Sequence, residues 1–83
     1  MKNMTEFELL VQEVADTIAH NECVTAGGPD ALDWASLTPS RVCDYTDGMD
    51  QRDWPASVKG KNYAKFVAAV SARLIPSWCR KIT

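Results

Sequence analysis

The side chains that could do chemistry in this 83-residue chain are few, and they are not clustered. His20 is the only histidine, and Cys23 follows three residues later, a spacing that would let one helical turn present two ligands to a metal ion. The chain offers no second ligand pair, because Cys43 and Cys79 are widely separated and no CxxC motif occurs. We therefore expect three reduced thiols, no metal site and no cofactor.

Catalytic signatures are likewise missing from the sequence. Gly27 and Gly28 lack the spacing and the lysine of a phosphate-binding loop. With one histidine, no nucleophile motif and no paired carboxylates in an apolar setting, no set of catalytic residues can be assigned. We expect a protein that is not an enzyme.

Four aspartates recur at every third position in the segment DYTDGMDQRD. A calcium-binding EF-hand loop needs oxygen ligands at every second position and a terminal glutamate, so this spacing does not predict a calcium site. It predicts a solvated acidic edge, beside which two aromatic side chains could anchor a protein partner. The candidate partner-binding residues are Asp44, Tyr45, Asp47, Asp50, Asp53 and Trp54.

Charge is unevenly divided along the chain. All eleven acidic residues and three of the nine basic ones precede Trp54, so this part carries a net charge of −8 and the remainder +6. The division fits a basic nucleic-acid-binding surface, an acidic surface that binds another protein or occupies its nucleic-acid channel, or pairing of the two parts within the fold. The candidate nucleic-acid-binding residues are Lys59, Lys61, Lys65, Arg73, Arg80 and Lys81.

A helix over about residues 5–20 should carry the first acidic residues. Thr5 and Glu8 form a capping-box pattern at its start, and Met4 and Leu9 occupy the positions of a hydrophobic staple. We expect this helix to end between residues 19 and 22. Its apolar stripe, at helical spacing, consists of Phe7, Leu10, Val11, Val14 and Ile18.

Two short helices are expected next, after a loop over residues 23–29. Asp30 resembles an N-cap for a helix over residues 31–36. Thr38 and Pro39 form a second start signal, an N-cap followed by a first-turn proline, and Gly48 should end that helix.

The last helix, expected over about residues 56–75, combines the densest apolar stripe in the chain with positive charge. The segment 53–55 precedes it, and Pro76 should stop it. Lys61 and Lys65 point away from the stripe. The stripe consists of Tyr63, Phe66, Val67, Val70 and Leu74.

These elements predict an all-α fold, a compact small helical bundle in which two short helices lie between two longer ones. The length supports a single domain over residues 1–83 with a small core. No run approaches the roughly 18 apolar residues of a membrane span, and Glu6 and Glu8 interrupt the apolar core that a signal peptide would need. We expect a cytoplasmic protein.

Together these observations favour a small non-enzymatic protein-interaction or inhibitor module that binds through its acidic, aromatic surface. Phages and mobile elements often produce small, self-contained helical proteins that inhibit host machinery. By this analogy, a host protein is the expected partner. The alternative is a nucleic-acid-binding protein that uses the basic C-terminal helix. A helix-turn-helix over residues 31–47 fits less well, because its reading helix would carry only Arg41 together with the repelling Asp44 and Asp47.

Overall fold

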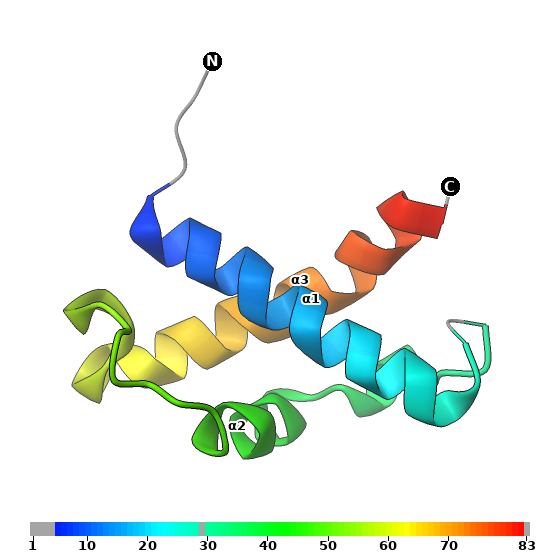
Figure 1. Cartoon of the computed structure of the whole chain (residues 1–83), viewed down its shortest axis with the longest axis horizontal. Helices are drawn as coiled ribbons and strands as arrows, with labels where there is room; N and C mark the ends of the chain where they lie inside the picture. The colour runs from blue at the N-terminus through cyan, green and yellow to red at the C-terminus, as the bar shows by residue number, and fades with distance from the viewer. Residues whose placement is uncertain (1–4, 29, 83) are drawn as a thin grey trace.

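The computed structural model describes the backbone of residues 5–28 and 30–82, and the side chains of this part of the chain as far as Leu74. Within these residues the α-helices are α1 (Glu6–Ala26), α2 (Pro39–Asp47) and α3 (Tyr63–Ile82), and the 3-10 turns are η1 (Trp34–Ser36), η2 (Ala56–Val58) and η3 (Gly60–Asn62). No strand occurs in the described residues, and the predicted all-α fold is confirmed. In Figure 1, α1 and α3 cross, and α2 lies beneath the crossing.

Polar capping determines where α1 begins. The Thr5 hydroxyl accepts a hydrogen bond from the Glu8 amide at 3.1 Å, and the Glu8 carboxylate accepts one from the Thr5 amide at 3.3 Å. The predicted capping box is therefore confirmed. Met4, the predicted staple partner of Leu9, lies outside the described residues, and Leu9 itself is 52% exposed.

The C-terminal end of α1 lies at Ala26, so the prediction of an end between residues 19 and 22 was wrong. Glu22 and Cys23 both turn into the interior, although a glutamate normally marks a solvated position. Gly27 stops the helix. Its own amide still donates to the Cys23 carbonyl at 3.0 Å, and its left-handed φ of 97° lets the Gly28 amide donate to the same carbonyl at 2.7 Å.

A single 3-10 turn, η1, occupies the segment where a short helix over residues 31–36 was expected. Asp33 caps this turn instead of Asp30, since its carboxylate accepts a hydrogen bond from the Ala35 amide at 3.1 Å. The helix prediction was wrong because Asp33, in the middle of the expected helix, is extended with φ −82° and ψ 96° to cap η1.

The bounds of α2 agree with the prediction. The Thr38 hydroxyl accepts a hydrogen bond from the Arg41 amide at 3.4 Å, and Gly48 forms the C-cap. Leu37, just before the cap, is buried, and its carbonyl accepts a hydrogen bond from the Ser71 hydroxyl at 3.2 Å. The entry of α2 is therefore tied to α3.

The bounds of α3 differ from the expected 56–75 at both ends. The turns η2 and η3 replace the first expected turns, because Gly60 adopts a left-handed φ of 59° that interrupts the helix. At the other end, α3 continues through Pro76, which was expected to stop it. A proline removes one amide donor and crowds the carbonyl four residues earlier, here that of Ala72. Because Ala72 is exposed, water can satisfy this carbonyl and the helix need not end.

The core lies where α1 and α3 cross. Phe66 is fully buried, and two half-buried rings meet it edge-on, Phe7 with a centroid distance of 5.9 Å and Trp54 with one of 5.4 Å. The predicted stripes of both helices are buried, apart from their half-buried members Phe7, Leu10 and Tyr63. The buried core consists of Val11, Val14, Ala15, Ile18, Ala19, Leu37, Val42, Val58, Phe66, Val67, Val70 and Leu74.

The outer faces of the two long helices carry polar side chains. Glu13 is exposed on α1. Lys61 in η3 and Lys65 at the start of α3 are exposed, and both point away from the apolar stripe as predicted. None of the helices in the described part of the chain is long and apolar enough to cross a membrane.

Replacing Phe66 with alanine should lower the free energy of unfolding by about 3–5 kcal/mol, because the substitution removes a fully buried ring and leaves a cavity. Urea denaturation followed by far-ultraviolet circular dichroism would measure the loss. Lys65→Ala, at the exposed neighbouring position, is the control and should change stability by less than about 0.5 kcal/mol. An unchanged denaturation midpoint for Phe66→Ala would contradict this packing.

Candidate functional site

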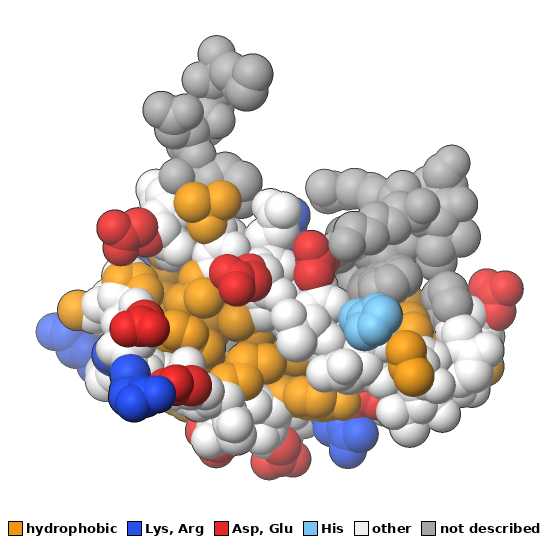
Figure 2. Space-filling model, in the orientation of Figure 1, with side chains coloured by type: hydrophobic (Ala, Val, Ile, Leu, Met, Phe, Trp, Pro, Cys, Tyr) orange, Lys and Arg blue, Asp and Glu red, His pale blue; other side chains and the backbone are white. Residues whose placement is uncertain are grey.

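The predicted acidic edge follows the second half of α2 and the connection from α2 to η2. Asp44, Asp47, Asp50 and Asp53 are all exposed, the first two on α2 and the other two on the connection. Figure 2 shows acidic side chains along the lower and left edges of the molecule, where Figure 1 places these two segments. The edge is therefore accessible, but its four carboxylates do not have the same surroundings.

Two of the four carboxylates already have partners within the chain. Asp47 accepts a hydrogen bond from the Tyr63 hydroxyl at 2.7 Å and a longer one from the Cys43 thiol at 3.8 Å. Asp50 forms an exposed ion pair with Arg52 at 2.8 Å, and this pairing lowers the pKa of the Asp50 carboxyl. Both side chains are therefore only partly available to a partner.

Asp44 and Asp53 form the other half of the set. Both are exposed, and neither makes a hydrogen bond or an ion pair, as far as the structure describes the chain. An exposed carboxylate without an internal partner keeps its charge and its acceptor capacity for an incoming group. The structure thus singles out two of the four predicted aspartates as available.

The Tyr63 hydroxyl joins the start of α3 to the end of α2. Besides Asp47, it contacts the hydroxyl of Thr46, which is fully buried and donates to the Cys43 carbonyl at 3.2 Å. Burial raises the pKa of Tyr63 to about 12, and the acceptor oxygen of Asp47 also favours the neutral phenol. Since a neutral phenol can donate to Asp47, this cluster is a structural tie between the two helices.

The aromatic members of the predicted site, Tyr45 and Trp54, are both half-buried. Trp54 lies edge-on against Phe66, with 62° between the ring planes. The guanidinium of Arg41 lies over the Tyr45 ring, with its central carbon 5.8 Å from the ring centroid. Burial, and next the charge of Glu22, raises the pKa of Tyr45. Both rings are held in place by neighbours and still expose part of their surface.

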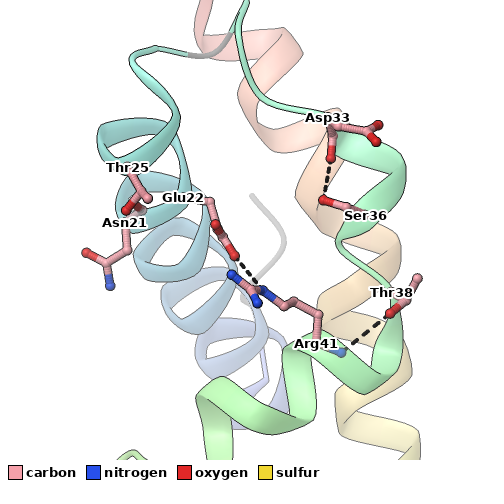
Figure 3. A network of polar contacts seen from close by, with 7 residues as sticks. All are labelled: Asn21, Glu22, Thr25, Asp33, Ser36, Thr38 and Arg41. Carbon is pink, nitrogen blue, oxygen red and sulfur yellow. Dashed lines mark hydrogen bonds and ion pairs between the residues drawn. The ribbon is translucent and has the colours of Figure 1, made fainter.

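Arg41 is a site residue that the sequence analysis missed. Its Nε donates to the Glu22 carboxylate at 2.8 Å, and Figure 3 shows the two side chains reaching toward each other from α2 and α1. The side chain of Glu22 is 8% exposed and that of Arg41 is 53% exposed. A signal was present, because Glu22 follows Ile18 by four residues on the buried stripe of α1, where a carboxylate requires a cationic partner.

A shallow surface pocket of ≈ 260 Å³ lies beside this ion pair. Arg41, Asp44 and Tyr45 line it. Because Glu22 engages the Nε of Arg41, the guanidinium has a fixed position at the wall of the pocket. The pocket therefore combines an ordered cation, an aromatic ring and a carboxylate without an internal partner.

The basic residues of the alternative site are not equally available. Lys61 and Lys65 are exposed and lie four residues apart, whereas Lys59 is half-buried. The side chains of Arg80 and Lys81 lie outside the described residues. The described part of a basic surface thus consists mainly of Lys61 and Lys65.

Arg73, also predicted to bind nucleic acid, is half-buried against α1. One of its terminal nitrogens donates to the Gln12 side chain at 3.3 Å, and its Nε is buried without an acceptor among the described residues. A guanidinium in this position contributes to packing between α1 and α3 more than to an open basic surface.

Among the described residues, the thiols and the histidine do not converge. Cys23 is buried, and this burial, reinforced by the nearby charge of Glu22, raises the pKa of its thiol, whereas His20 is exposed on α1. Cys23 and Cys43 are free thiols, and Cys79 lies outside the described side chains. No group of three potential metal ligands occurs in the described part of the chain.

Comparisons with protein-family models, with curated proteins and with solved structures find no match for this chain. Its function is therefore inferred from the geometry and charge of its own residues. The features that bear most directly on function are the available carboxylates of Asp44 and Asp53, the rings of Tyr45 and Trp54, and the ordered guanidinium of Arg41.

Removing Arg41, the cation that pairs with the buried Glu22, should cost more than removing the cation of the exposed pair. Arg41→Ala should lower the free energy of unfolding by about 1–3 kcal/mol, because it leaves the Glu22 carboxylate buried without a partner. Arg52→Ala is the matched control, since it breaks an ion pair of the same 2.8 Å length at an exposed position and should cost less than about 1 kcal/mol. Equal shifts of the urea midpoint would show that the burial of Glu22 has no energetic consequence.

Replacing Tyr63 with phenylalanine should lower the free energy of unfolding by about 1–3 kcal/mol, because it removes the hydrogen bond to the Asp47 carboxylate and the contact with the buried Thr46 hydroxyl. The folded-state pKa of about 12 lies above the ordinary value of 10.0, so the hydroxyl contributes fully below pH 10 and its contribution is lost as the pH rises toward 12.

Urea midpoints at pH values of about 9 and 11 would measure this dependence. The native chain should lose more stability between the two than Tyr63→Phe does. An identical loss in both proteins would contradict the raised pKa of Tyr63.

Proposed function

We propose that this chain is a small, non-enzymatic protein-interaction module that binds a protein partner through an acidic–aromatic surface, formed by Asp44, Tyr45, Asp53 and Trp54. One observation carries the proposal: two exposed carboxylates without internal partners accompany two half-buried aromatic rings. Tyrosine and tryptophan are the usual anchors of protein interfaces, because they bury large areas and lose few rotatable bonds.

The carboxylates of this surface and the ordered guanidinium beside it would contribute to binding in different ways. Asp44 and Asp53 favour a basic partner surface and would speed its encounter with the chain. Arg41 is already ordered by Glu22, so its terminal nitrogens can donate to a partner with a small loss of side-chain freedom. The further proposal, that the partner is a host protein inhibited by a module of phage or mobile-element type, rests on the analogy of size alone.

Nucleic-acid binding is the second candidate function. Lys61 and Lys65 favour it, because both are exposed, in η3 and at the start of α3, and form no ion pair with any of the described residues. Asp44 and Asp47 on the neighbouring helix would oppose it, since carboxylates repel phosphates. We place it second for this reason.

Asp44→Lys combined with Asp53→Lys should abolish capture of the partner protein from the native host, because it reverses both available charges of the surface. Thermal stability should change little, since neither carboxylate has an internal partner. Capture would be followed by mass spectrometry. Asp30→Lys is the control, the same reversal of charge at a single exposed residue outside the surface, and it should leave capture intact.

Capture that survives the double reversal would contradict the proposal. Nuclease-sensitive recovery that falls steeply between about 50 and 200 mM salt, and that depends on Lys61 and Lys65, would support nucleic-acid binding instead.

A further inference from the structure

Resting on the proposed function, we infer that the partner segment is a cationic amphipathic helix, with an apolar stripe bordered by lysine or arginine. Its stripe lies on an apolar band between α1 and the connection after α2, and its basic residues face carboxylates along both borders of that band. This is the helix-in-groove mode of recognition, with added charge at the borders.

The apolar band consists of Phe7, Leu10, Met49 and Trp54, all half-buried and all packed on the core. Phe7 on α1 and Trp54 on the connection contact the same buried ring of Phe66, so they are neighbours although they are far apart in sequence. Figure 2 shows hydrophobic side chains gathered into a band on this face of the molecule. Half-buried side chains already fixed by the core supply contact area without further ordering.

Carboxylates lie on both sides of the apolar band. On α1, Glu6 and Glu13 are exposed, four residues before and three residues after Leu10, so helical geometry places them beside it. On the connection, the exposed Asp53 directly precedes Trp54. Figure 2 shows acidic side chains both above and below the hydrophobic band.

The segments that form the band carry a net charge that favours a cation over a polyanion. Residues 5–58 contain eleven acidic residues and two basic ones, and both basic residues, Arg41 and Arg52, are in ion pairs with acidic neighbours. A nucleic acid or an anionic membrane would be repelled from this face, because its phosphates need cations to neutralise them. A purely charged peptide would leave the apolar band uncovered.

An α-helix fits the band better than an extended strand does. Strand addition needs the free edge of a sheet, and the described residues contain no strand. A helix presents apolar residues at i, i+3, i+4 and i+7 on one side and can place basic residues on both flanks of that stripe. This pattern matches an apolar band with a carboxylate border on each side.

The test uses a synthetic helical peptide of about 18 residues, or five turns, with leucine along one stripe and lysine on its flanks. Isothermal titration calorimetry at about 50 mM salt measures its affinity for the full chain. Glu13→Lys and Asp53→Lys each reverse one border of the band and should each weaken binding at least about tenfold. Asp30→Lys, the matched control, should change it less than about twofold.

A second peptide keeps every lysine and replaces each leucine with serine. Its affinity for the native chain should be at least about tenfold weaker, because it cannot bury the apolar band. Equal binding of the two peptides, or equal effects of Glu13→Lys and Asp30→Lys, would overturn the inference. Self-association of the native chain that Asp53→Lys abolishes would overturn it in favour of a second copy of this chain.

The inference and the proposed function can fail separately. If the leucine–lysine peptide does not bind, but capture of the host partner still depends on Asp44 and Asp53, the inference is wrong and the proposed function stands. If capture also survives the double reversal, both are wrong.

Discussion

The contact of Phe7 and Trp54 with the buried ring of Phe66 is the interaction on which the rest of this small structure depends. It joins α1, α3 and the connection after α2, which are distant in sequence. The chain has two phenylalanines, both in this cluster, and a domain of this size has few other large side chains that could replace them. The position of Trp54, and therefore of Asp53 beside it, follows from the ring beneath.

The orientation of α2 depends on directional polar contacts more than on apolar area. Val42 is the one apolar residue of this helix that is fully buried. Tyr63 holds its C-terminal end through Asp47, and Arg41 reaches from its first turns to Glu22 on α1. Charge-assisted hydrogen bonds fix direction as well as distance. The same short helix therefore uses some of its charged residues for structure and leaves Asp44 exposed, without a partner among the described residues.

Local signals predicted those parts of the fold that depend on neighbours in sequence, such as the capping box at Thr5 and the helical stripes. The sequence did not reveal features whose cause lies elsewhere in the fold. Helical spacing from Ile18 places Glu22 on the buried stripe, but its partner Arg41 lies nineteen residues later and only the fold brings the two together. The acidic edge was identified from spacing alone, but the internal role of Asp47 depends on Tyr63, which only the packing of α3 brings near.

Glu22 is the only buried charged residue in the described part of the chain. Its ion pair with Arg41 determines how α2 is aligned along α1. Sliding α2 along α1 by one helical turn, about 5.4 Å, would place the guanidinium of Arg41 against Ile18 or Ala26. The carboxylate would then be left in the interior without a counter-charge, at a large energetic cost. Two apolar side chains at these positions would tolerate such a slip. The ion pair thus selects one alignment of the two helices, and with it the direction in which Tyr45 faces the solvent.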